Sequence, residues 1–215
     1  MPRKKRPAGA TDEPRAAAAA RRRRALGRDR MPPLPEAMLT PAQRVALDEI
    51  VAGRRGALIG PFIPALRSPV FMSRLQQLGE YLRFDNALGP KLGELAILLT
   101  ARRFTQQFEW FVHAPIAAER GLSPDLIDAI AEGRRPIGMA ADEAIVYDFF
   151  VELERTQSVS DETYALAVAA FGEAGVVDLV GIIGYYSLLA MLMNVARTPL
   201  PPGEKPALAP FPANG

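Results

Sequence analysis

Residues 88–122 read LGPKLGELAILLTARRFTQQFEWFVHAPIAAERGL, and their pattern decides the fold class. Proline is favoured at the first position of a helix, so a helix is expected to begin at Pro90. It is expected to continue through Leu95, Leu98 and Leu99, which follow the helical spacing of apolar residues. The first half of this stretch therefore predicts an apolar helix.

The second half of the stretch predicts another helix, from Thr105 as its N-cap to about Arg120. Gly121 is expected to end it, because glycine readily adopts the left-handed conformation that often follows a helix. Pro115 lies inside this helix and predicts a kink, since proline cannot donate the helical hydrogen bond. Two consecutive helices are thus expected over residues 88–122.

Similar start signals recur along the chain. A serine or threonine followed by proline predicts helix starts at Thr40-Pro41, Ser68-Pro69 and Ser123-Pro124. A Pro/Gly-rich loop is expected at 56–64, and further helices at about 140–156, 161–171 and 176–196. No stretch alternates apolar and polar residues between hairpin turns, so no sheet is expected. The sequence predicts a single all-α domain of about seven helices.

Three polar side chains share one face of the second helix. At 100° per residue, Gln106, Glu109 and His113 lie within about 60° of one another. Glu109 and His113 are four residues apart, so the carboxylate can bind one imidazole nitrogen, set the tautomer and raise the basicity of the ring. Glu94 lies in an otherwise apolar helix, where burial raises the pKa of a carboxyl unless a cation or donor meets it. Together these groups predict a proton-transfer site.

Other interpretations of these residues stay open. A Glu-His pair on a solvated helix face is common, and a lone histidine beside aromatic residues is often simply packed. Glu94, near a helix start, can complement the helix dipole. If the site is functional, Arg102 or Arg103 is available to hold an anionic substrate. Two carboxylates and one imidazole are a weak metal signal, so no metal is expected.

The composition excludes several classes of function. The 215 residues include no cysteine and one histidine, which excludes disulfides, thiolate metal sites, thiol catalysis and multi-histidine metal sites. No P-loop and no G-x-S-x-G motif can be read. The hydrophobic fraction of 49% and the charged fraction of 23% are those of an ordinary globular protein.

Residues 1–35 differ from the rest in charge. They hold eleven Lys or Arg and three Asp or Glu, a net charge of +8, so a chain of net charge +2 leaves −6 for the remainder. This segment is expected to be a disordered basic tail that is solvated rather than bound to nucleic acid or lipid. It has no apolar core of a secretory signal, and a cytoplasmic protein is expected. The folded domain is expected at 36–205, with a flexible end at 206–215.

Residues 179–196 carry no formal charge over eighteen residues, which makes them a marginal candidate for a membrane span. The segment also contains glycine and polar residues and follows six amphipathic helices. We therefore expect a central or subunit-interface helix instead, and no membrane contact. Gly181 and Gly184 allow another helix to approach closely, which predicts a homo-oligomer.

The stretch quoted above also resembles the carboxymuconolactone decarboxylase family, which includes the alkylhydroperoxidase-D-like proteins. The resemblance is carried by LGPKLGELAIL from residue 88, FEWFVH from residue 108 and GL at residue 121. It extends upstream to GPF from residue 60, and downstream to GYYSLLAM from residue 184 and PLPPG from residue 199. It covers about residues 38–205 and leaves out the basic tail.

The family implies an alkylhydroperoxidase-D-like all-α subunit that assembles into trimers or hexamers, with sites near subunit contacts. Its peroxidase branch has a C-x-x-C motif whose positions are held here by Gln106 and Glu109, so thiol peroxidase activity is not expected. Its decarboxylase branch uses no cofactor and resembles the Glu109-Trp110-x-x-His113 pattern. The resemblance thus implies a cofactor-free carboxy-lyase acting on a small carboxylated lactone or a related acid of aromatic catabolism.

The resemblance also implies roles for individual residues. His113 is expected to carry the proton and Glu109 to orient it. Glu94 is expected to act as a second acid or base, or to keep His113 charged. Arg103 or Lys91 is expected to pair with the carboxylate of the substrate. The other residues expected to bind the substrate are Gln106 and Trp110.

Departures from the family pattern support a second interpretation. The family often has a basic residue where Gly93 stands, a His-Trp pair where Arg103-Phe104 stands, and a polar residue where Ile63 stands. With these changes, the chain can also be interpreted as a non-catalytic helical homo-oligomer that binds a small ligand or a partner.

Overall fold

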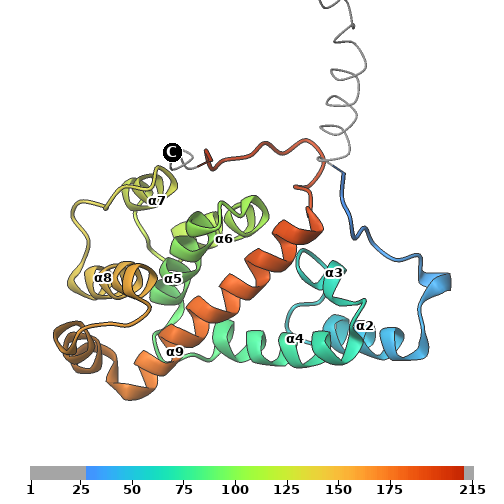
Figure 1. The fold of residues 1–215 in the computed structure, drawn as a ribbon, viewed down its shortest axis with the longest axis horizontal. Coiled ribbons are helices and arrows are strands. Elements are labelled where there is room, and N and C mark those ends of the chain that lie inside the picture. The colour runs from blue at the N-terminus through green and yellow to red at the C-terminus, as the bar shows by residue number, and fades with distance from the viewer. Residues whose placement is uncertain (1–27, 211–215) are drawn as a thin grey trace, which may run out of the picture.

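The computed structural model describes residues 28–210, and the greater part of the predicted basic tail, residues 1–27, lies outside this range. Within it the secondary structure is entirely helical, which confirms the all-α prediction. The elements, shown in Figure 1, are a 3-10 turn η1 (Glu36–Met38) and the helices α2 (Pro41–Ala52), α3 (Phe62–Ala65), α4 (Pro69–Phe84), α5 (Pro90–Arg103), α6 (Gln107–Glu119), α7 (Pro124–Ala131), α8 (Ala141–Thr156) and α9 (Asp161–Ala196).

Helix α9 crosses the molecule diagonally and divides the other helices into two groups. Figure 1 shows α2, α3 and α4 on one side of it and α7 and α8 on the other. Helix α5 is central, because it packs against α6, α8 and α9. The polar stripe predicted on residues 94–113 therefore lies at the interior junction of α5 and α6 with α9.

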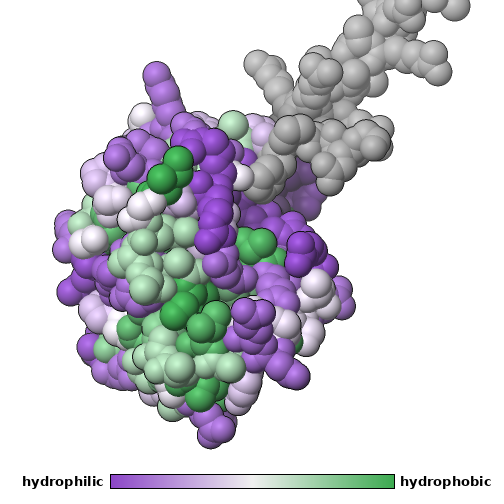
Figure 2. Space-filling view, turned by 90° about the vertical axis from the view of Figure 1, so that its left-hand side faces the viewer, coloured by the Kyte–Doolittle hydropathy of each residue, from purple (hydrophilic) through white to green (hydrophobic). Residues whose placement is uncertain are grey.

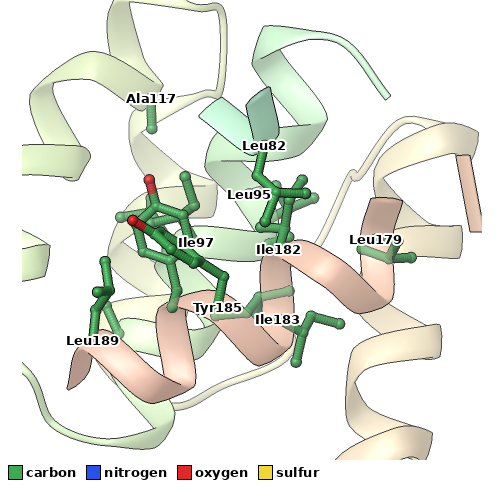
Figure 3. Close-up of a cluster of buried hydrophobic side chains, with 14 of the residues drawn as sticks. Leu82, Leu95, Ile97, Ala117, Leu179, Ile182, Ile183, Tyr185 and Leu189 are labelled. Carbon is green, nitrogen blue, oxygen red and sulfur yellow. The ribbon is translucent and has the colours of Figure 1, made fainter. Parts of the chain in front are cut away.

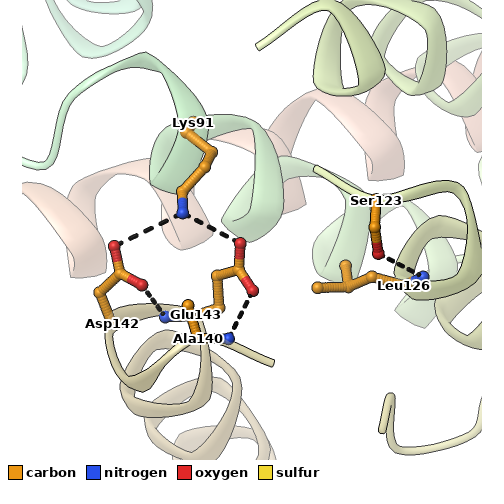
Figure 4. Close-up of polar contacts among 6 residues, drawn as sticks. All are labelled: Lys91, Ser123, Leu126, Ala140, Asp142 and Glu143. Atoms are coloured by element: carbon orange, nitrogen blue, oxygen red, sulfur yellow. Dashed lines mark hydrogen bonds and ion pairs between the residues drawn. The ribbon is translucent and has the colours of Figure 1, made fainter. Parts of the chain in front are cut away.

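The Ser/Thr-Pro signals mark helix starts as predicted. The Thr40 hydroxyl accepts a hydrogen bond from the Gln43 backbone N–H, while the Gln43 side chain accepts one from the Thr40 backbone N–H. Ser123 accepts a bond from the Leu126 N–H at 3.2 Å, as Figure 4 shows. Ser68 precedes α4, but its side chain does not cap that helix.

The predicted cap of the second helix is wrong by one residue. Gln106 is the N-cap of α6, and its side chain accepts a hydrogen bond from the Phe108 N–H at 2.7 Å. Thr105 has a φ of 47°, which is left-handed, whereas an N-cap residue normally has an extended backbone. The short connection between α5 and α6 requires this tight turn, and so moves the cap from Thr105 to Gln106.

The predicted loop at 56–64 contains the start of a helix that the sequence did not predict. Helix α3 is too short to be stable alone, and burial of Phe62 in the core holds it in place. Gly60, just before it, has a φ of 55°. A Cβ on Gly60 would lie 2.5 Å from a ring carbon of Phe108, so only glycine permits this close approach of the loop to α6.

The core forms where α9 meets α4 and α5. Gly172 has non-helical backbone angles and divides α9 into two segments, close to the gap predicted between 171 and 176. The second segment supplies most of the packing. Figure 3 shows the side chains that meet there, among them Leu82 of α4, Leu95 and Ile97 of α5, and Leu179, Ile182, Ile183, Tyr185 and Leu189 of α9.

Helix α9 alone, within the described part of the chain, is long and apolar enough to cross a membrane. Core helices of soluble proteins also meet this criterion, and 39% of its most apolar window is buried inside the protein. The second segment of the helix also presents apolar side chains to the surface. These exposed residues are Val177, Val180, Leu188, Met191 and Val195.

Chain segments beyond the predicted domain limits also contact the folded body. The Arg30 N–H donates to the Ala196 carbonyl at 2.8 Å, and Arg67 donates to the Pro32 carbonyl at 2.7 Å. At the other end, Leu208 is buried in the core and both its backbone polar groups bind the Gln107 side chain. Residues 28–35 and 206–210 therefore belong to the folded unit, whereas the sequence assigned them to a tail and a flexible end.

Candidate functional site

The single histidine of the chain pairs with a carboxylate from a neighbouring helix. Nδ1 of His113, on α6, lies 2.7 Å from Oε2 of Glu94, on α5. Both side chains are buried, with exposures of 6% and 7%. This corrects the predicted pairing of His113 with Glu109: spacing on α6 permits that pair, but the packing of α5 on α6 brings the carboxylate of Glu94 to the ring.

The Glu94 contact orients the imidazole. With Glu94 ionised, Nδ1–H donates to the carboxylate, and the other ring nitrogen, Nε2, carries the lone pair of the neutral ring. The ring also packs edge-on to Tyr186 of α9, with centroids 5.2 Å apart. His113 is thus held between two helices, and Nε2 is the atom that can take or give a proton.

Glu109 lies close by but has a different environment. It is only 3% exposed, and neither carboxylate oxygen has a hydrogen-bond partner. Burial raises the pKa of Glu109 well above its usual value, because the charged form loses its hydration without compensation. The structure therefore favours an uncharged Glu109, which is a proton donor rather than the anion that orients His113.

A surface pocket reaches both His113 and Glu109. Its volume is about 40 Å³ and it opens to the surface, so it encloses only part of a ligand. Its residues come from the loop before α3 and from α3, α4, α6 and α9. They are Arg55, Ile59, Pro61, Phe62, Arg83, Phe108, Glu109, Val112, His113, Tyr186 and Leu189. The pocket therefore combines an apolar wall with two cations, one acid and the histidine.

The two arginines of the pocket are site residues that the sequence did not reveal. Arg55 lies over the ring of Phe62 at 4.7 Å, and its Nε and Nη2 are buried without an acceptor. Arg83 lies 5.3 Å from the ring of Phe84. Neither guanidinium forms an ion pair with any residue in 28–210. No spacing signal links residues 55 and 83 to residue 113, because only the fold brings the loop after α2 and helix α4 next to α6.

Tyr185 lies beside these groups. Its hydroxyl is buried without a hydrogen-bond partner, and burial raises its pKa to about 12. A Cβ on Gly79 of α4 would lie 1.9 Å from this hydroxyl and 2.6 Å from Nη2 of Arg55. The absence of a side chain at Gly79 therefore makes room for both polar groups beside the pocket.

Two basic residues predicted to bind the substrate lie elsewhere. Lys91 extends to the first turn of α8, where it lies 3.0 Å from Glu143 and 3.6 Å from Asp142 (Figure 4). Arg103 pairs with Glu154 of α8 at 2.6 Å. Neither residue lines the pocket of His113. Acidic residues of α8 lie beside both ends of α5 and form ion pairs with Lys91 and Arg103.

The two other predicted substrate-binding residues have structural contacts. Gln106 caps α6 and donates to the Asn194 side chain at 2.9 Å, which ties α6 to the end of α9. Trp110 is buried in the core beside the site. Of the seven residues predicted for the site, His113 and Glu109 line the pocket and Glu94 contacts His113 from behind the lining, whereas the other four neither line the pocket nor bond to His113.

In the part of the chain that the structure describes, no three His, Asp or Glu side chains are grouped as a metal site requires. The side chains at the pocket provide an oriented imidazole, a buried carboxyl group and two guanidinium groups. Compared with models of protein families and with curated proteins, the chain matches none.

Proposed function

We propose that the protein is a cofactor-free lyase that acts on a small carboxylated lactone or a related acid of aromatic catabolism. The observation that carries the proposal is the buried Glu94–His113 pair beside a pocket that also contains Glu109. The pair provides a proton carrier whose orientation is set, and the pocket gives a ligand access to it. The choice of lactones rests on the family resemblance of residues 38–205.

Decarboxylation requires groups that the pocket contains. When the bond to the departing carboxylate breaks, its electron pair passes into an extended enolate, and a proton must then reach carbon. The protonated form of His113, oriented by Glu94, supplies that proton from Nε2 and is left neutral, and the ring takes up a proton from solvent after the product leaves. Uncharged Glu109 donates a hydrogen bond to the developing negative charge, which stabilises it in a site of low dielectric. No step of this sequence requires a redox reagent.

The test is turnover by the full-length protein of a panel of carboxylated lactones, followed by ultraviolet absorbance and by release of carbon dioxide. We expect one or more members to be decarboxylated, and the His113→Gln variant to lose this activity. Arg74→Gln, which removes an exposed charge from α4 outside the pocket, is the matched control. Failure of the whole panel, or full activity in His113→Gln, would contradict the proposal.

A non-catalytic homo-oligomer is the second candidate, and the surface of α9 favours it. The exposed residues Val177 and Val180, and two turns further on Leu188, Met191 and Val195, are spaced so that all five lie on one face of the helix. Hydrophobic residues also gather among polar ones on another side of the molecule, which carries α8 and the start of α9 (Figure 2). Exposed apolar patches of this kind mark interaction sites.

We expect Leu188→Glu to shift the protein toward the monomer in sedimentation velocity, because a charge on this stripe would be buried between copies. Val45→Glu, an equally drastic change at an exposed position of α2, is the control and should leave the sedimentation unchanged. A wild-type protein that is monomeric at every concentration would contradict self-association through α9.

A further inference from the structure

The pocket contains cations without counter-ions. Several other arginines of the protein form ion pairs at the surface. Examples are Arg54–Asp85, Arg103–Glu154 and Arg135–Asp148. Arg55 and Arg83 form no such pair with an acid within residues 28–210, although the pocket that both line also contains the carboxyl group of Glu109. Glu94 is paired with His113, and neither oxygen of Glu109 has a hydrogen-bond partner, so neither carboxyl group forms an ion pair with these arginines.

Arg55 shows most directly that an acceptor is needed. An arginine is charged at every physiological pH. Burying one of its N–H groups without an acceptor destabilises the fold, because the group gives up its hydrogen bonds to water. Two of its nitrogens, Nε and Nη2, are in that condition. A carboxylate is the partner that a guanidinium binds best, through two parallel hydrogen bonds. The ring of Phe62 beneath Arg55 restrains its orientation.

The rest of the pocket wall is apolar. Ile59, Phe62, Phe108, Val112 and Leu189 line the pocket together with the two arginines and His113. A ligand that fits must therefore present an anionic group at one end and a small apolar body at the other. Inorganic anions match the first requirement only, and uncharged aromatic compounds match the second only.

From these observations we propose that Arg55 and Arg83 form a carboxylate-binding subsite, which holds a small, largely apolar organic acid beside His113. The inference deepens the proposed function and rests on it for the identity of this pocket as the substrate site. It replaces Arg103 and Lys91 as the predicted partners of the substrate carboxylate. Neither oxygen of Glu109 bonds to Arg55 or Arg83, so both guanidinium groups are available to the ligand.

The test measures binding without turnover. His113 is the only histidine of the chain, so its imidazole resonances in NMR spectra are assigned without ambiguity. Benzoate is the probe, and benzamide, which has the same shape without the charge, is its control. We expect benzoate to shift the His113 resonances of the full-length protein and to bind at least about tenfold more tightly than benzamide.

Variants assign the effect to the two arginines. Arg55→Gln and Arg83→Gln are each expected to weaken benzoate binding by about tenfold or more, and Arg74→Gln, on the same helix as Arg83, to leave it unchanged. If a glutamine variant does not fold, Arg55→Lys and Arg83→Lys keep the charge and should retain measurable binding. No benzoate-dependent shift, equal binding of benzoate and benzamide, or wild-type affinity in both glutamine variants would overturn the subsite.

The outcome separates the subsite from the lyase. Arginine-dependent binding of benzoate, combined with failure of the whole lactone panel, would support the subsite and remove the proposed reaction. Turnover of a lactone with unchanged KM in both glutamine variants would overturn the subsite and leave the reaction standing.

Discussion

Glu94→Gln is expected to lower kcat by about 10²-fold to 10⁴-fold on any substrate that the lactone panel identifies, as is usual for loss of a positioned acid-base group. Glutamine keeps the size of the side chain but cannot stabilise the charged imidazole from 2.7 Å. His113→Gln is expected to cost as much. The measurement is kcat and KM against pH for each variant, with circular dichroism to show that the helical fold is retained.

The double variant is the sharper test of this pair. Because Glu94 acts only through His113, Glu94→Gln combined with His113→Gln should be no slower than His113→Gln alone. Two residues with independent roles would instead multiply their effects. A multiplicative loss, or a Glu94→Gln enzyme with the wild-type kcat and pH profile, would show that Glu94 does not work through the imidazole.

Glu109→Gln is expected to stabilise the fold at neutral pH, although it removes a predicted catalytic group. The buried carboxyl is held uncharged and its pKa lies well above that of the same group in the unfolded chain. Unfolding then releases a proton, and wild-type stability is full below the ordinary carboxyl pKa and falls as pH rises toward the folded pKa. Glutamine has nearly the same shape but does not ionise, so the stability of the variant does not fall with pH for this reason.

The measurement is the free energy of unfolding in urea for both proteins from pH 4 to pH 9. The two should be closest at pH 4, and the advantage of Glu109→Gln should then grow by roughly 1.4 kcal/mol for each pH unit until Glu109 ionises in the folded protein. Asp148→Asn, which removes an exposed carboxylate on α8, is the control and should show no such growth in this direction. A constant difference between Glu109→Gln and wild type would mean that Glu109 is charged in the fold.

The amino-acid sequence alone determined the helical architecture. The Thr40, Ser123 and Gly-Pro90 signals act within one turn of the chain, so they mark the starts of α2, α7 and α5 whatever those helices pack against. The sequence also singled out Glu94, Glu109 and His113, because polar residues stand out within the apolar pattern of residues 88–122.

Only the tertiary structure decided which of these residues interact. The i,i+4 spacing predicted that Glu109 pairs with His113. The packing of α5 on α6 instead places Glu94 against the ring and leaves Glu109 buried and unpaired. The tertiary structure also decided which basic residues lie at the site. Lys91 and Arg103 are near the predicted site in sequence but form ion pairs with α8, and the pocket is lined by Arg55 and Arg83 instead. Capping and periodicity depend on neighbours within a few residues, whereas ion pairs and pockets depend on how separate helices pack.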